Sequence, residues 1–156
     1  MSIIKPNNNT ISAITALPAA IPTGKVLQVV TATDSTNRST TSTSFVTASN
    51  TLSVDITPSS TSSKILIHLS CMLYVASSFA RLTIFRDNTD LSGSSGAFAT
   101  TDGDSAYYAT SGMHFLDSPN SSSQITYQMR FKTNSTQVEI ANVSALGTIT
   151  AYEIAG

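Results

Sequence analysis

Short stretches in which apolar and polar residues alternate recur from residue 25 to the end of the chain. The most regular is 123–133, whose apolar positions are Ile125, Tyr127, Met129 and Phe131. Polar residues stand between them, which is typical of a strand with one face in a core and the other in water. The pattern predicts a half-buried strand with these four side chains pointing inward.

The stretch 64–76 is apolar on both faces of the strand that it predicts. One face carries Ile65, Ile67, Leu69, Cys71, Leu73 and Val75. The opposite face includes Leu66, His68, Met72 and Tyr74. A strand that is apolar on both faces lies in a central position or under a second covering surface, such as a neighbouring subunit. The second set is therefore a group of candidates for a trimer interface.

Further stretches rich in β-branched residues are separated by turns of serine, asparagine and glycine. They lie at 25–33, 39–49, 51–58, 80–87, 107–117, 136–145 and 146–156. None of them has helical periodicity. About eight short strands predict an all-β fold, an antiparallel two-sheet β-sandwich of jelly-roll-like topology over residues 25–156.

Residues 1–24 are expected to form an extended N-terminal arm, because Pro6, Pro18 and Pro22 each favour extended backbone. The arm is too apolar for a solvated tail; its large apolar residues are Ile3, Ile4, Ile11, Ile14, Leu17 and Ile21. Docking onto another surface explains such a segment most simply. The alternative is that the arm packs along its own domain.

Composition excludes several classes of protein. Of the 156 residues, 26 are serine and 23 are threonine, while 11% are charged and the net charge is −1. These values fit neither a coiled coil nor a charged disordered tail. Eight basic residues against nine acidic ones leave no basic face, so no nucleic-acid partner is expected. No stretch approaches the roughly 20 apolar residues that span a bilayer, so no membrane association is expected either.

Catalysis has little support in the sequence. Only His68 and His114 could act as bases at neutral pH, and His68 is expected to be a hydrogen-bonded structural residue. Glu139 and Glu153 are expected to face outward, and they do not indicate a glycosidase pair. Cys71 is expected to be a small buried hydrophobe. We therefore expect neither an enzyme nor a cofactor.

Four aspartates flank a long loop that is predicted at 88–106, namely Asp87, Asp90, Asp102 and Asp104. Carboxylates on a loop can bind a calcium ion, but this spacing is not that of an EF-hand. Aspartate also forms turns by bonding its own backbone. We expect the turn-forming role and no metal site.

The same region carries three aromatic residues among small ones, Phe98, Tyr107 and Tyr108. Aromatic rings on a loop can stack on a saccharide or contact a host receptor. These residues are candidates for distal-loop contacts with a host glycan. A solvated loop without a ligand is the alternative interpretation.

Four motifs follow one another along the chain: GKVLQVV at 24–30, TSTSFV at 41–46, ITPSSTSSKIL at 56–66 and TITAYEIAG at 148–156. Together they resemble a β-sandwich module of virion surface proteins of tailed bacteriophages, especially cyanophages. The resemblance covers roughly residues 24–76 and 146–156, and the loop at 88–106 lies outside it.

The resemblance implies a structural virion protein, usually trimeric, of the capsid decoration (cement) or tail-fibre type. Because only about 24 residues precede the predicted sandwich, a fibre shaft has no room, and we expect a decoration protein. The arm would then dock on the major capsid protein, and the chain would form a homotrimer on the virion surface after assembly in the host cytoplasm. A short tail-fibre or receptor-binding module that recognises host polysaccharide is the alternative.

Overall fold

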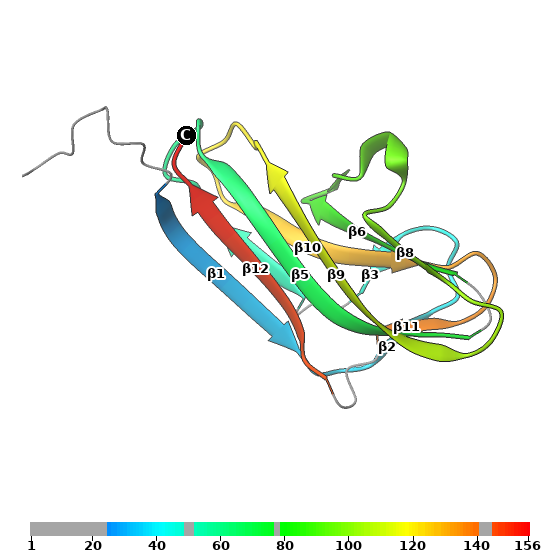
Figure 1. Cartoon of the computed structure of the whole chain (residues 1–156). Helices are drawn as coiled ribbons and strands as arrows, with labels where there is room; N and C mark the ends of the chain where they lie inside the picture. The colour runs from blue at the N-terminus through cyan, green and yellow to red at the C-terminus, as the bar shows by residue number, and fades with distance from the viewer. Residues whose placement is uncertain (1–24, 49–51, 77–78, 141–144) are drawn as a thin grey trace, which may run out of the picture.

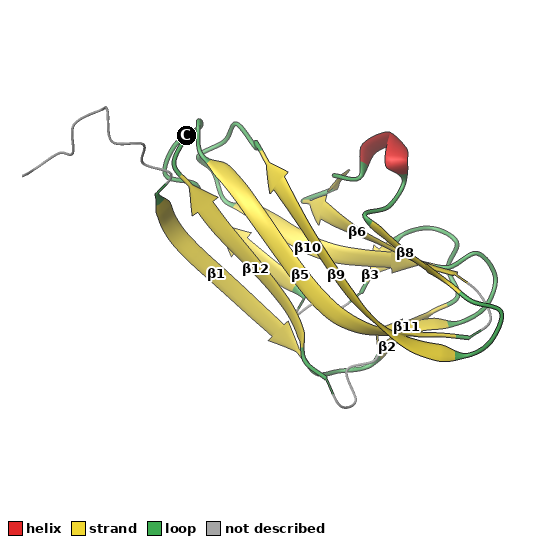
Figure 2. Ribbon diagram, viewed as in Figure 1, coloured by secondary structure: helices red, strands yellow, loops and turns green. Residues whose placement is uncertain are grey.

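Two antiparallel sheets pack face to face in the computed structural model, which describes residues 25–48, 52–76, 79–140 and 145–156 (Figure 1). Strands make up nearly all of the regular structure in Figure 2, and the short 3₁₀ turn η1 (Gly93–Ser95) is the exception. The predicted all-β, two-sheet sandwich is therefore confirmed. The predicted arm, with its six apolar residues, lies outside the described residues and stays a prediction.

Sheet A contains six strands in the order β1-β12-β5-β11-β2, with β9 beside β5. Its strands are β1 (Val26–Asp34), β2 (Arg38–Thr40), β5 (Lys64–Val75), β9 (Tyr107–Asp117), β11 (Val138–Ile140) and β12 (Gly147–Ile154). Strand β9 pairs along one edge of β5, while β12 and then β11 pair along the other. The long strands β1, β12, β5 and β9 thus form a continuous surface, which faces the viewer in Figure 1.

Sheet B also contains six strands, and β10 is central to it. Its strands are β3 (Val46–Thr47), β4 (Ser53–Ile56), β6 (Phe79–Arg86), β7 (Thr89–Asp90), β8 (Ala99–Asp102) and β10 (Ile125–Lys132). Strand β6 pairs along one edge of β10, and β4 and β3 pair along the other. The described residues form twelve strands, more than expected, because several contain only two to four residues.

The core between the sheets is built from alternate strand positions, as the sequence predicts. Ile125, Tyr127, Met129 and Phe131 of β10 are each at most 4% exposed. The predicted inward face of β5 is also buried, including Cys71. The thiol of Cys71 donates to Met129 Sδ across the sandwich at 3.8 Å, and burial raises its pKa from 9.0 to about 12. Cys71 is therefore the small buried hydrophobe that we expected.

The segment 88–106 is not the plain loop that the sequence predicts. It contains β7, η1 and β8, and both short strands pair with β6. Leu91 and Phe98 pack against the core, and the backbone N–H of Phe98 donates to Leu82 O at 2.9 Å. A few apolar anchors thus hold a segment whose serine and glycine content suggests a loop.

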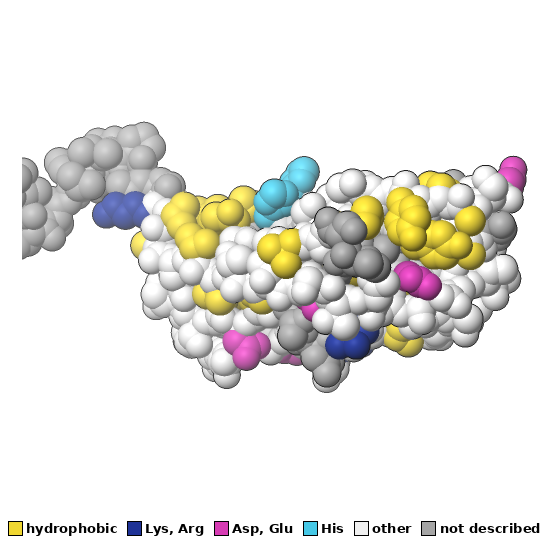
Figure 3. Space-filling model, turned by 90° about the horizontal axis from the view of Figure 1, so that it is seen from below, with side chains coloured by type: hydrophobic (Ala, Val, Ile, Leu, Met, Phe, Trp, Pro, Cys, Tyr) yellow, Lys and Arg dark blue, Asp and Glu magenta, His cyan; other side chains and the backbone are white. Residues whose placement is uncertain are grey.

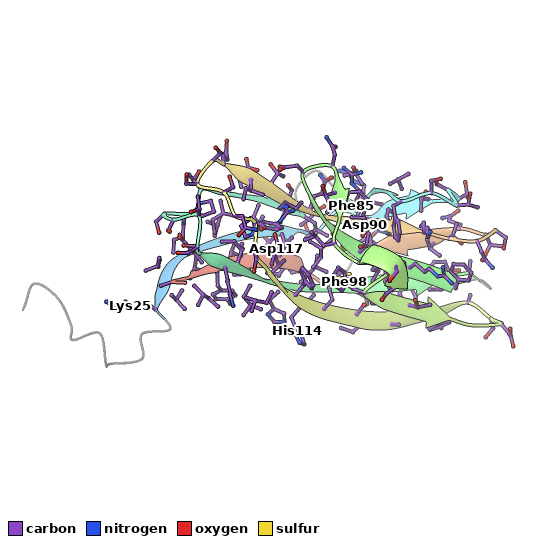
Figure 4. The ribbon with its side chains drawn as sticks, turned by 90° about the horizontal axis from the view of Figure 1, so that it is seen from above. Lys25, Phe85, Asp90, Phe98, His114 and Asp117 are labelled. Carbon is purple, nitrogen blue, oxygen red and sulfur yellow. The ribbon has the colours of Figure 1, made fainter. Side chains whose placement is uncertain are left out.

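A polar cluster joins the two sheets at the ends of β6 and β9. Arg86 Nη1 donates to both carboxylate oxygens of Asp117, at 3.0 and 2.8 Å. The Tyr127 hydroxyl donates to Asp117 Oδ2 at 2.7 Å. Asp117 belongs to sheet A and its two partners to sheet B, and Figure 4 shows Asp117 between the layers. The cluster therefore fixes one sheet against the other.

Glu153 corrects one sequence prediction, because it faces the interior rather than solvent. It is 0% exposed, and its carboxylate accepts hydrogen bonds from Gln28 Nε2 at 2.6 Å, Ser59 N at 2.7 Å, Ser59 Oγ at 2.6 Å and Ser63 Oγ at 2.7 Å. Burial by itself raises the pKa of this carboxyl, but the bonds from Ser59, Gln28 and Ser63 outweigh it and lower the pKa from 4.5 to about 2. The carboxylate thereby fastens the turn at 57–63 to β1 and β12.

Candidate functional site

The outward side chains of β1, β12, β5 and β9 form one surface, which we call the outer face of sheet A. Strand register places Val29, Tyr152, Leu66 and Leu116 in a single row across these four strands. Val29 is 53% exposed and Leu116 is 47% exposed. An apolar row thus crosses the full width of the sheet in contact with solvent.

The β-bulge at the start of β1 extends this apolar area. The register between β1 and β12 shifts there, between Val26 and Gln28. Val26 and Leu27 are 55% and 45% exposed, respectively. Contiguous exposed apolar area of this kind marks sites of interaction in soluble proteins.

The outer face of sheet A carries almost no formal charge. Lys64, at the beginning of β5, is the only Lys, Arg, Asp or Glu at the outward positions of its four strands. Most other outward positions that are not apolar carry hydroxyls, namely Thr31, Thr33, Ser70, Thr110, Thr148 and Thr150. Hydroxyls can be buried at an interface more cheaply than ions, because an unpaired buried charge costs far more than an unpaired hydroxyl.

The outer face of sheet B has the opposite character. Three cations lie over aromatic rings there: Arg81 over Phe79 at 4.6 Å, Arg130 over Phe85 at 3.9 Å and Lys132 over Phe45 at 4.4 Å. Charged side chains are depleted at the centres of protein interfaces and common on solvated surface. The two faces therefore differ in composition: charged side chains are common on the outer face of sheet B and nearly absent from that of sheet A.

All four trimer-interface candidates lie on the outer face of sheet A, at alternate positions of β5: Leu66, His68, Met72 and Tyr74. Sequence reasoning missed their cross-strand neighbours Val29, Leu116 and Tyr152. Each of these three stands at an outward position of a different strand, and register between distant strands decides that they meet. Coverage of this face by a second subunit stays a prediction.

His68 and His114 lie directly opposite each other on β5 and β9. Both are exposed, which argues against the structural role expected for His68. Figure 3 shows the histidine side chains projecting from the surface beside hydrophobic ones, and Figure 4 shows His114 pointing away from the sandwich. Together with Leu66 and Tyr152 they line an open hollow of about 320 Å³.

The three aromatic residues proposed for loop contacts do not form one surface. Phe98 packs on Phe115, with ring centroids 4.9 Å apart, and Tyr107 is partly buried against the core. Tyr108 is 64% exposed, and its ring centroid lies 5.1 Å from that of Tyr74. Of the three candidates for a glycan contact, Tyr108 alone is well exposed, and it lies beside Tyr74, one of the trimer-interface candidates.

Two of the four aspartates around the segment 88–106, Asp87 and Asp90, form turns, as we expected. Asp87 has a φ of 52°, and its carboxylate accepts the N–H of Thr126 at 3.0 Å. Asp90 accepts Thr83 Oγ1 at 2.6 Å and the N–H and Oγ of Ser92 at 2.9 and 2.8 Å. Burial alone raises the pKa of Asp90, but the hydrogen bonds from Thr83 and Ser92 outweigh it, so the pKa lies below its ordinary value.

Of the other two aspartates, Asp102 ends β8, and Asp104 is exposed in the bend that follows. Within the described ranges, no three or more His, Cys, Asp and Glu side chains are grouped so that they could hold a metal ion. The described part of the chain also has no helix with the length and hydropathy needed to cross a membrane.

Comparison with known proteins gives distant structural likenesses. No protein-family model and no curated protein matches the sequence. A mutant VP2 protein of infectious bursal disease virus, from derived particles, is similar with a TM-score of 0.42 and 13% identity, over 81% of this chain and 36% of that one. A crystal structure of a viral particle of the same virus gives a TM-score of 0.41 and 12% identity, over 83% and 36%. The chain thus spans about a third of those proteins, and a likeness this distant says nothing about function.

Proposed function

We propose that the chain is a structural virion protein, a bacteriophage capsid decoration (cement) protein that binds the outside of the head and stabilises the shell. The observation that carries the proposal is the outer face of sheet A, which is broad, nearly uncharged and apolar at one end. The motif resemblance of residues 24–76 and 146–156 to phage virion modules supports the same assignment.

Self-association accounts for the composition of this face. Each Å² of apolar surface removed from water contributes about 25 cal/mol, so covering the exposed row gains free energy. The row reaches both edge strands, with Val29 on β1 and Leu116 on β9. Closed cyclic symmetry allows each copy to cover part of its neighbour's face without exposing a new one. We infer a homotrimer in which Leu66, His68, Met72 and Tyr74 face the neighbouring subunits.

The N-terminal arm supplies the contact with the shell in this proposal. Lys25 directly precedes Val26 and Leu27, so the arm joins the domain at the apolar end of the outer face. The isoleucines and leucine of residues 1–24 would dock on the major capsid protein. The sandwich would then stand outward on the virion surface, after assembly in the host cytoplasm.

A short tail-fibre or receptor-binding module that recognises host polysaccharide is the second candidate. The pair Tyr74 and Tyr108 favours it, because Tyr108 is 64% exposed. Tyrosine offers a sugar both an apolar ring face and a hydroxyl. The pair lies at the other end of β5 from Leu66, and because Tyr74 is also a trimer-interface candidate, a glycan and a neighbouring subunit would compete for it.

Deleting residues 2–21 is expected to abolish cosedimentation of the chain with purified heads of the virus that encodes it. The reason is that the deletion removes the apolar anchors and leaves the sandwich intact, which circular dichroism would verify. A matched control, Tyr108→Ala with the arm in place, should bind heads like the wild type. Head binding that survives the deletion would contradict the proposed anchor.

The same two variants test the alternative. A glycan-binding module would bind host polysaccharide equally well with and without residues 2–21, and Tyr108→Ala would lose that binding. That result, together with an intact chain that does not bind heads, would replace the decoration role by the receptor-binding one.

A further inference from the structure

The histidine pair on the outer face of sheet A has the arrangement of a chelating site. His68 on β5 and His114 on β9 are direct register partners. Directly opposite residues of antiparallel strands have Cβ atoms about 4.5–5.5 Å apart and project to the same side of the sheet. We propose that these two imidazoles bind one divalent transition-metal ion of the Zn²⁺ class, with one ring nitrogen from each.

The backbone holds the two ligands in place before any ion arrives. Strands β5 and β9 pair without a register shift from Ile65 opposite Asp117 to Val75 opposite Tyr107. The histidines lie near the middle of this ladder, so the backbone does not have to rearrange for both rings to reach one ion. Both are exposed, and the ion reaches them directly from solvent.

The surroundings of the pair suit a cation. Its neighbours along the strands and across them carry no positive charge; they are Leu66, Ser70, Gly112, Leu116 and Thr150. Leu66 and Tyr152 form walls of the hollow that the histidines line. The hollow is open to solvent, so water can complete the coordination of a bound ion.

The chemistry of the ligands selects the metal. Imidazole nitrogen suits zinc, copper and nickel, whereas calcium and magnesium prefer oxygen ligands. Zinc usually takes four ligands, so two positions remain for water. In the homotrimer, which rests on the proposed function, a side chain of a neighbouring subunit can take one of the open positions, so that the ion joins two copies.

Calorimetric titration of the intact chain with zinc chloride tests the site. The background is small, because the chain has two histidines and its single cysteine is buried. We expect saturable zinc binding that is lost in both His68→Gln and His114→Gln. Thr110→Ala, on the same face of β9, should retain it, and calcium chloride should give no binding. Circular dichroism of each variant verifies its fold.

Absence of zinc binding by the intact chain would overturn the site, as would equal binding by His68→Gln and the wild type. Sedimentation velocity with zinc and with a chelator separates this inference from the proposed function. Zinc binding by a chain that stays monomeric would support the site and contradict the self-association. Self-association without zinc binding would support the virion role and contradict the site.

Discussion

Replacing Glu153 with alanine is expected to lower the free energy of unfolding by about 3 kcal/mol. The carboxylate is fully buried, and its removal leaves donors of Gln28, Ser59 and Ser63 without their acceptor. Each buried donor that loses its acceptor costs about 1–3 kcal/mol, and partial access of water reduces the sum. Urea denaturation followed by circular dichroism measures the loss.

Glu139→Ala is the matched control for this substitution, since it removes the other glutamate of the chain. Glu139 lies partly exposed on β11 and accepts a hydrogen bond from Gln137. Its removal should change the free energy of unfolding by no more than about 0.5 kcal/mol. Equal losses in the two variants would show that the buried network of Glu153 does not stabilise the fold.

The same carboxylate should make stability depend on pH in the acid range. The pKa of Glu153 is about 2 in the folded chain against an ordinary value of 4.5, so its contribution is complete above the ordinary value. The contribution is lost as the pH falls from the ordinary value through that of the folded chain. The free energy of unfolding, measured by urea denaturation at a series of acid pH values, should therefore fall more steeply with decreasing pH for the wild type than for Glu153→Gln. An equal dependence on pH in the two proteins would contradict the assignment.

Replacing Asp117 with alanine is expected to cost about 3–5 kcal/mol, because it leaves a partly buried charge and a buried hydroxyl without their shared acceptor. The Arg86 side chain is 27% exposed and that of Asp117 is 8% exposed. Burial and the hydrogen bond to Asp117 raise the pKa of Tyr127, so its hydroxyl stays a donor at all working pH values. Thermal and urea unfolding measure the change.

Tyr127→Phe removes only the hydrogen bond from the tyrosine hydroxyl to Asp117 and keeps the ring. Comparing it with Asp117→Ala therefore separates this bond from the ion pair between Arg86 and Asp117. Its cost should be about 1 kcal/mol. Because Asp117 joins β9 to β6 and β10, the double variant with Arg86→Met should recover part of the loss of Asp117→Ala. An Asp117→Ala variant no less stable than Tyr127→Phe would show that the polar cluster around Asp117 does not hold the two sheets together.

Alternation predicted the faces of individual strands well. In β10 the residues Ile125, Tyr127, Met129 and Phe131 are buried, because a strand with one face in a core leaves only every second position to apolar side chains. The residues of both faces of β5 were also identified: the inward face lies in the core, and coverage of the opposite face by a subunit stays a prediction. Local sequence carries this information because the side-chain period of a strand is fixed by its backbone.

Strand register and the polar networks between distant segments could not be predicted from the sequence. Glu153 follows Ile149 and Ala151 on the inward positions of β12, and hydroxyls of a turn about 90 residues away make its burial tolerable. The pairing of His68 with His114 depends in the same way on how β5 and β9 align. Contacts between distant segments are set by the packing of the whole sandwich, which no local pattern reports.

Multi-angle light scattering of the intact chain tests the central claim, that copies of the chain associate through the outer face of sheet A. We predict a mass about three times 16.4 kDa for the wild type. Leu116→Lys, which places a charge in the apolar row, should give the mass of one chain. Ser53→Lys, on the outer face of sheet B, should keep the mass of the wild type. A wild-type mass of 16.4 kDa at every concentration, or a Leu116→Lys variant that still associates, would contradict the account.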